Sequence, residues 1–142
     1  MGLQTDQILE DIKNDTSVEA AVDFIDVSEV RRELEADIAA AFPSRNKFAD
    51  ACAINSSHLS EFLRGTKKIG RDLLLSMFIT LGYDLDRTQD MLRRLGMPAL
   101  YVRDTRDYQI ALAIRTQKSL DETDQLLKAK NLKMLTTLAK NK

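Results

Sequence analysis

The sequence predicts an all-α protein, and three observations lead to this prediction. Residues that favour helices dominate the 142-residue chain, which contains only five glycines and two prolines. Apolar residues recur at helical spacing through most of the chain. Serine, asparagine or aspartate stands just before several of these apolar runs, where it can cap a helix. A chain of this length forms one compact domain with a substantial core, or a small domain with an appendage.

Residues 1–27 form an acidic N-terminal arm. Residues 3–13 carry four aliphatic residues near one side of a short predicted helix, which must dock to be stable. Residues 22–27, VDFIDV, alternate apolar and acidic residues, as a short strand does, or a loop with apolar anchors. The arm has two interpretations: it packs on the rest of the protein, or it mimics DNA or occupies a partner and restrains binding in the free protein.

A long helix is predicted over residues 28–42, with Ser28 as its N-cap and Pro43 at its end. Six shorter helices are predicted after Pro43, over residues 45–52, 56–64, 71–81, 85–95, 105–117 and 120–131. The expected N-caps of these helices are Ser44, Asn55, Asp84, Asp104 and Ser119. Glycine ends three of them, at Gly65, Gly82 and Gly96.

The second half of the chain contains an internal repeat. Residues 70–100 align with residues 105–135 after a shift of 35 residues, with eight identities in 31 positions. The identical pairs are Arg71/Arg106, Asp72/Asp107, Ile79/Ile114, Leu85/Leu120, Asp86/Asp121, Thr88/Thr123, Leu92/Leu127 and Leu100/Leu135. This pattern predicts a helix pair that occurs twice, with the two copies stacked on their apolar faces.

The repeat suggests a division of the chain. We expect a domain over residues 28–96, an appended helix pair over residues 97–135, and a frayed tail over residues 136–142. The Arg–Asp pairs that open the two copies are expected to form salt bridges or caps. The acids Asp84, Asp86, Asp121, Glu122 and Asp124 are expected to cap helices. Tyr101, Arg103 and Arg106 form either a secondary anion-binding patch or a link between the copies.

Charge is distributed unevenly along the chain. The net charge is −1, but residues 1–42 carry −8 and residues 43–142 carry +7. Residues 45–71 alone contain six basic and two acidic residues. This asymmetry is compatible with a basic surface that binds phosphates, accompanied by an acidic arm. It is equally compatible with a solvated acidic tail.

Residues 45–65, RNKFADACAINSSHLSEFLRG, carry a recognisable pattern of small, apolar and capping residues. The positions that form the pattern are Arg45, Phe48, Ala49, Ala53, Ile54, Asn55, Leu59, Phe62 and Gly65. This stretch resembles the helix-turn-helix of the lambda-repressor-like, or XRE-type, family. The resemblance implies a five-helix domain over residues 28–96. Ala53 stands where the family usually has glycine, which costs strain if the turn needs a positive φ.

The resemblance also assigns a recognition helix, residues 56–64. Leu59, Phe62 and Leu63 then face inward. The DNA-binding residues implied are Arg45, Asn55, Ser56, Ser57, Ser60, Glu61, Arg64, Lys67 and Lys68. Serine hydroxyls would contact base edges or phosphates, and Glu61 would accept a hydrogen bond from cytosine N4. Arg45, with the N-terminal amides of its helix, and the two lysines would contact phosphates.

Two functions remain open at this point. The whole layout resembles small bacterial helix-turn-helix proteins of Gram-positive type that are labelled transcriptional regulators, which implies double-stranded DNA as partner and a homodimer. However, Ser56, Ser57 and Ser60 occupy positions where Arg, Gln or Asn would make stronger base contacts. The alternative is a non-enzymatic regulatory adaptor that binds a protein through the helical repeat or through the same serine face.

The residues do not indicate an enzyme. Cys52 and His58 are the only cysteine and histidine, and Cys52 stands where a small buried residue is expected. One cysteine and one histidine cannot form an ordinary zinc site, and no phosphate-binding glycine loop occurs. We therefore expect no cofactor, no metal and no catalytic residue. The sequence has no apparent secretory signal or membrane span, so a cytoplasmic location is expected.

Overall fold

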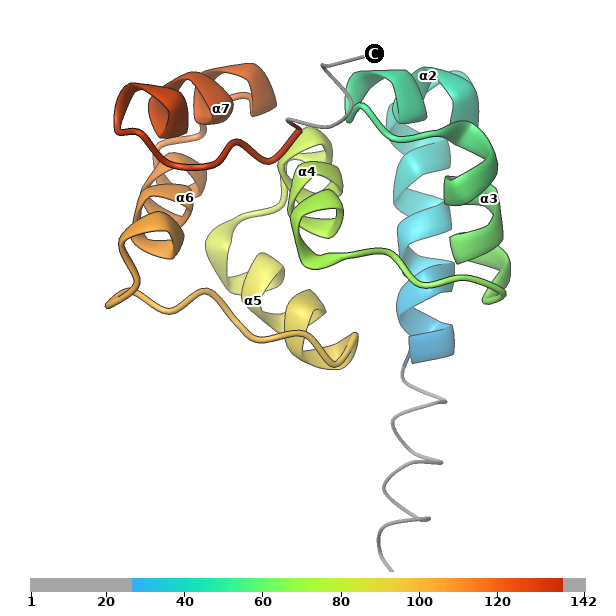
Figure 1. Ribbon diagram of the computed structural model, residues 1–142. Coiled ribbons are helices and arrows are strands. Elements are labelled where there is room, and N and C mark those ends of the chain that lie inside the picture. The colour runs from blue at the N-terminus through green and yellow to red at the C-terminus, as the bar shows by residue number, and fades with distance from the viewer. Residues whose placement is uncertain (1–26, 137–142) are drawn as a thin grey trace, which may run out of the picture.

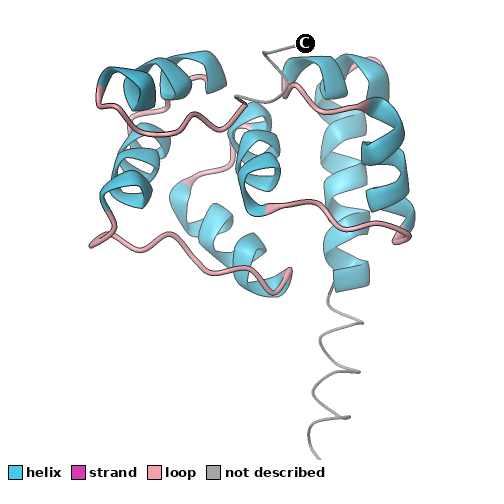
Figure 2. Ribbon diagram, viewed as in Figure 1, coloured by secondary structure: helices cyan, strands magenta, loops and turns pink. Residues whose placement is uncertain are grey.

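The computed structural model describes residues 27–136, and every regular element in this range is an α-helix (Figure 2). The all-α prediction is therefore confirmed for this part of the chain. The predicted helix over residues 3–13 lies outside the described residues, as does nearly all of the extended segment over residues 22–27. None of the described helices is both long and apolar enough to cross a membrane.

The helix boundaries agree closely with those expected from the capping residues. A first helix covers residues 27–41 of the described range. It is followed by α2 (Arg45–Ala51), α3 (Ser56–Arg64), α4 (Arg71–Leu81), α5 (Leu85–Arg94), α6 (Thr105–Arg115) and α7 (Leu120–Ala129). The five predicted N-caps after Pro43 all accept a hydrogen bond from their helix.

Ser28 is the exception among the predicted caps. Residue 27 is already helical, so Ser28 lies inside the first helix. Its hydroxyl accepts a hydrogen bond from Arg32 Nη1, at 3.3 Å, one turn further along. The prediction was wrong because a serine near an apolar run also occurs within exposed helices, where its side chain bonds locally.

The described helices pack around one continuous core. The first helix, α2 and α3 lie on one side, α6 and α7 on the other, and α4 lies between them (Figure 1). The core cluster runs from Val30 in the first helix to Leu135 near the end of the described range. Residues 74–79 of α4 are all buried, because α4 is covered on several sides.

Polar contacts also join the first helix to α5. Glu33 accepts hydrogen bonds from Arg94, the shorter at 2.7 Å, and Asp37 lies 3.0 Å from Arg87. The hydroxyl of Tyr83 donates to Asp37. Burial, together with this bond to Asp37, raises the pKa of Tyr83 well above its ordinary value, so the phenol stays protonated.

The two copies of the repeat share their backbone geometry. Gly82 and Gln117, 35 residues apart, follow α4 and α6 and both have positive φ, at 78° and 58°. Gly96 and Asn131 repeat this after α5 and α7, at 77° and 61°. The second copy therefore has left-handed turns at the corresponding positions, although it lacks the glycines that favour them.

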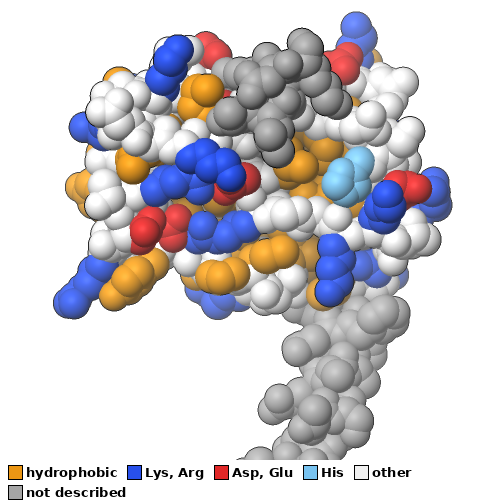
Figure 3. Space-filling model, viewed as in Figure 1, with side chains coloured by type: hydrophobic (Ala, Val, Ile, Leu, Met, Phe, Trp, Pro, Cys, Tyr) orange, Lys and Arg blue, Asp and Glu red, His pale blue; other side chains and the backbone are white. Residues whose placement is uncertain are grey.

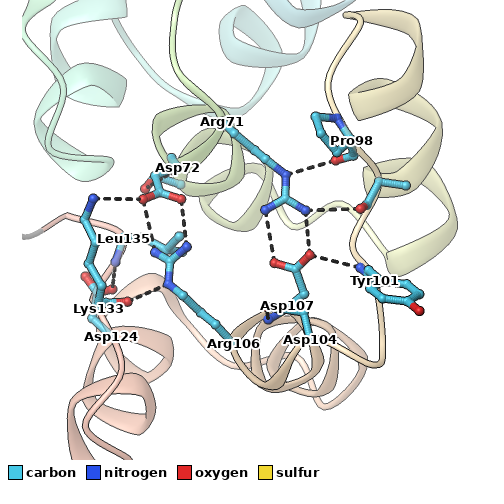
Figure 4. A network of polar contacts seen from close by, with 12 residues as sticks. Arg71, Asp72, Pro98, Tyr101, Asp104, Arg106, Asp107, Asp124, Lys133 and Leu135 are labelled. Atoms are coloured by element: carbon cyan, nitrogen blue, oxygen red, sulfur yellow. Dashed lines mark hydrogen bonds and ion pairs between the residues drawn. The ribbon is translucent and has the colours of Figure 1, made fainter.

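The arrangement of the copies is two-fold rather than a simple stack. Arg71 contacts Asp107 through its two terminal guanidinium nitrogens, at 2.8 and 3.0 Å, and Arg106 contacts Asp72 at 3.0 and 3.1 Å (Figure 4). α4 likewise contacts α7 while α5 contacts α6. Reciprocal contacts of this kind mark an isologous interface, here formed within one chain.

We call the two reciprocal Arg–Asp pairs the clamp. Each of its arginines also donates a hydrogen bond to the segment that ends its own copy of the repeat. Arg71 Nε donates to the carbonyl of Pro98 at 2.9 Å, and Arg106 Nε donates to that of Lys133 at 2.8 Å. Arg106 is therefore a link between the copies, the second of the two alternatives that the sequence left open for it. The Arg–Asp pairs form salt bridges, as expected, and these join the two copies.

Asp124 has a different role from the cap that was expected. It is fully buried, and its carboxylate accepts hydrogen bonds from the backbone N–H of Leu135, at 2.6 Å, and from the hydroxyl of Thr136. Gln89, the corresponding residue of the first copy, accepts from the N–H of Leu100 at 2.7 Å. Both side chains hold the segment that follows their helix pair, so Thr136, assigned to the tail, is buried.

Candidate nucleic-acid interface

The turn between α2 and α3 sets the relative position of the two helices. Ala53 has a φ of 58°, so this position does need the left-handed conformation that the family pattern gives to glycine. The backbone N–H of Ile54 then donates to the carbonyl of Ala49 at 2.9 Å. Ala49 is fully buried, and its small side chain lets the helices approach closely.

Ala53→Gly is expected to raise the free energy of unfolding by about 1 kcal/mol, because glycine adopts a positive φ without steric strain. Ala36→Gly, at an exposed position in the middle of the first helix, is the matched control and should lower it by about 0.5–1 kcal/mol. Urea denaturation of both variants measures the two changes. A loss of stability in Ala53→Gly would contradict the strain at this turn.

The orientation of α3 follows from its ends and its apolar side. Asn55 Oδ1 accepts hydrogen bonds from the backbone N–H groups of Ser57, at 2.9 Å, and His58, at 3.1 Å. Gly65 ends the helix with a φ of 86°. The buried residues of α3 are the three that the sequence placed inward: Leu59, Phe62 and Leu63.

The opposite side of α3 forms a shallow depression of about 260 Å³. Its lining consists of Ser56, Ser57, Ser60, Glu61 and Arg64. All five are predicted site residues, and they belong to one helix face because their spacing follows the helical repeat. The face is polar and carries hydrogen-bond donors and acceptors.

Arg45, at the start of α2, reaches this face. Its Nη1 donates to the hydroxyl of Ser60 at 3.3 Å, and its Nη2 lies 2.6 Å from Glu35 of the first helix. Ser44 already accepts a hydrogen bond from the N–H of Lys47 at the start of α2. A phosphate that approaches the start of α2 would find the Arg45 guanidinium already paired with the Glu35 carboxylate.

The two predicted lysines occupy different surroundings. Lys67 Nζ lies 3.6 Å from Glu61 Oε1, which joins the loop after α3 to the α3 face. Lys68 has no such acidic partner within the described residues; both lysines also line a second groove, together with Arg31 of the first helix. Basic and acidic side chains thus lie side by side over α2 and α3, rather than as a continuous basic surface (Figure 3).

Cys52 and His58 have structural roles in this region. Burial raises the pKa of the Cys52 thiol to about 12, and its Sγ donates to the carbonyl of Phe48 at 3.2 Å. This confirms Cys52 as a core residue. His58 has a structural contact, because its Nε2 forms a hydrogen bond with the carbonyl of Lys68 at 3.0 Å. This bond holds the loop after α3, which carries Lys67 and Lys68, against α3.

Sequence reasoning missed two residues at this site, Glu35 and Arg31. Both lie on the first helix, 10 residues or more from the stretch that carries the family pattern. Their places depend on how the first helix packs against α2 and α3. The spacing of residues within a short stretch of sequence does not indicate that packing.

Comparisons with known protein families, curated proteins and solved structures found no match. Among residues 27–136 there is also no group of three or more histidine, cysteine or acidic side chains placed to hold a metal ion.

Proposed function

We propose that this chain binds double-stranded DNA as a transcriptional regulator, with α2 and α3 as a lambda-repressor-like helix-turn-helix. One observation carries the proposal. The five outward residues of α3 form a single polar face, and Arg45 of α2 and Lys67 of the following loop flank it. A helix that projects such a face between cations has the form needed to enter a major groove and contact the phosphates beside it.

The ion pairs at this face are compatible with phosphate binding. The side chains of Lys67 and Glu61 are 61% and 36% exposed, and those of Arg45 and Glu35 are 36% and 51% exposed. Exposed pairs of this kind contribute only about 0–1 kcal/mol, so a DNA phosphate can replace the carboxylate. The neighbouring acids reduce non-specific attraction, which makes binding depend more on the fit of the α3 face.

A second function, that of a protein-binding adaptor, is favoured by a separate observation. Four large hydrophobic side chains are more than a third exposed in the described range, and all lie within residues 101–112: Tyr101, Val102, Tyr108 and Leu112. Exposed apolar residues that gather in one region often mark a protein contact. In an adaptor, this region, which covers the segment between the two copies and part of α6, would bind the partner.

Lys67→Glu combined with Lys68→Glu is expected to weaken duplex binding by roughly tenfold or more, because two phosphate contacts become repulsive. A pool of duplexes with randomised sequence, enriched on the wild-type chain, serves as the probe. For the wild type, affinity should fall steeply between about 50 and 200 mM salt, and the double variant should lower the log–log slope by roughly two.

The matched control is Lys128→Glu combined with Lys130→Glu at the end of α7, which changes the net charge equally. This control should leave the duplex affinity within about threefold, because non-contact charges act only through the screened field. If both double variants weaken duplex binding equally, the effect comes from net charge alone, and this would contradict the proposed interface. If no duplex binds, and Tyr108→Glu with Leu112→Glu abolishes capture of a protein partner, the adaptor is the correct function.

A further inference from the structure

A groove of about 660 Å³ opens between the start of the first helix, the loop after α3 and the segment after α5. Its apolar residues include Val27, Leu95 and Met97, which are half-buried, and its cations are Arg31, Lys67 and Lys68. Among residues 27–136 the lining contains no aspartate or glutamate. The groove therefore combines an apolar floor with a rim that is basic in the described part of the chain.

Arg31 is the most informative residue of this rim. The side chain of Arg31 lies close to the end of α3, since a Cβ built at Gly65 would lie 2.9 Å from Arg31 Nη2. No hydrogen bond or ion pair joins the half-buried side chain of Arg31 to another residue within the range 27–136. Other arginines with reduced exposure, such as Arg71 and Arg94, have carboxylate partners there. Arg31 is thus placed to receive an anionic group at this groove.

The chain itself supplies a segment with complementary chemistry. Residues 1–26 contain seven acidic residues and one lysine, a formal charge of −6. Leu3, Ile8, Leu9 and Ile12 recur at helical spacing among these acids. Val27, where this segment joins the described chain, is itself part of the groove lining.

Chain length allows the segment to return to the groove. Fourteen residues separate Ile12 from Val27. A chain of that length spans at most about 50 Å when extended, which is sufficient to turn back across a small domain. A tethered segment also has an effective concentration in the millimolar range, which favours it over a free peptide or a second copy of the chain.

We propose that the acidic arm, residues 1–26, docks in this groove. The aliphatic side chains of residues 3–12 cover the apolar floor, and the neighbouring carboxylates pair with Arg31, Lys67 and Lys68. The arm thereby removes apolar surface from water and supplies the anion that Arg31 lacks within the described residues.

Docking has a regulatory consequence that rests on the proposed function. Lys67 and Lys68 belong both to the rim of the groove and to the predicted phosphate contacts. An arm bound there competes with DNA for the same cations, so docking of the arm lowers the affinity of the free protein for DNA. A full-length chain with Asp6→Asn, Glu10→Gln and Asp11→Asn should bind duplex about tenfold more tightly, within the usual range of coupling between two sites.

The docking itself can be tested without DNA. In the full chain, Gln7→Cys is modified with a nitroxide spin label under native conditions, where the buried thiol of Cys52 reacts slowly. Amide signals of Gly65, Thr66, Lys68 and Gly96 are expected to broaden. Signals of α6 and α7 should stay sharp. Arg31→Glu with Lys68→Glu should abolish the broadening, whereas the control Lys128→Glu with Lys130→Glu should preserve it.

Three outcomes overturn the docking proposal. The first is that the amide signals of the groove stay sharp, and the second is that neither charge-reversal variant changes the broadening. The third is broadening that occurs only when spin-labelled protein is mixed with isotope-enriched, unlabelled protein. That third result would place the arm on a second copy of the chain. Because these readouts contain no DNA, they separate the docking from the proposed function. Confirmed docking in a chain that binds no duplex would leave the groove intact as an arm-binding site.

Discussion

Replacing Arg71 by methionine is expected to lower the free energy of unfolding by about 3–5 kcal/mol, because the substitution leaves a buried carboxylate without its partner. Asp107 is only 8% exposed and accepts hydrogen bonds from Arg71 and from the backbone N–H of Tyr101. Arg71 also donates to the carbonyls of Pro98 and Ala99. Urea denaturation, with the midpoint and the slope fitted together, measures the change.

The dependence of this loss on pH identifies its cause. Burial raises the pKa of Asp107, but the hydrogen bonds from Arg71 and Tyr101 and the charges of Arg71 and Arg106 outweigh it and hold the pKa below its ordinary value. Asp107 therefore contributes stability above the unfolded pKa of about 3.9, and this contribution is lost as pH falls through the lower folded pKa. Without Arg71 the carboxyl protonates more easily, so the gap between the two proteins should narrow in acid.

Two further variants test the same interpretation. Arg103→Met removes an exposed arginine near the clamp and should change stability by no more than about 0.5 kcal/mol. Adding Asp107→Asn to Arg71→Met removes the uncompensated charge and should recover part of the loss. A double variant no more stable than Arg71→Met alone would show that the lost carbonyl contacts, and not the buried charge, dominate.

Phe48→Ala is the second large effect that we expect. Phe48 is fully buried in α2, and its ring meets that of Phe42 edge to face, with centroids 5.2 Å apart. Truncation removes this contact and leaves a cavity between the first helix, α2 and α3, at a cost of about 3–5 kcal/mol. The midpoint of urea denaturation should fall with little change in its slope.

The matched variant Phe48→Leu keeps most of the volume and should cost less than about 1.5 kcal/mol. Similar losses in the two variants would mean that the edge-to-face contact of the rings, and not the side-chain volume, stabilises this position. Duplex binding by Phe48→Ala, measured where the variant is still folded, should also weaken, because Phe48 supports the crossing of α2 and α3.

Helix boundaries and caps were predictable because they depend on residues only a few positions apart. Ser44, Asn55, Asp84, Asp104 and Ser119 each accept a hydrogen bond from a backbone N–H two or three residues later. Such a contact forms whenever the helix forms, whatever packs against it. The sequence left open whether Ala53 needs a positive φ, and the structure shows that it does.

Contacts between distant helices were not predictable in the same way. Arg71 and Asp107 are 36 residues apart, and Arg106 and Asp72 are 34 apart. The repeat showed that these residues correspond, but a parallel stack and a two-fold arrangement use the same sequence pattern. Asp124 was misassigned for the same reason, since its partners lie 11 and 12 residues further along.

At the candidate site, too, the local features were predictable from the sequence and the long-range contacts were not. The periodicity of residues 56–64 determined by itself which side of α3 is buried, because burying Leu59, Phe62 and Leu63 leaves only one face outside. Only the tertiary structure decided that Arg45 and Lys67 meet acids there, and that Lys68 and Arg31 border a separate groove. Those positions depend on the packing of the first helix against α2 and α3, and long-range packing is a property of the whole core, not of any short stretch of sequence.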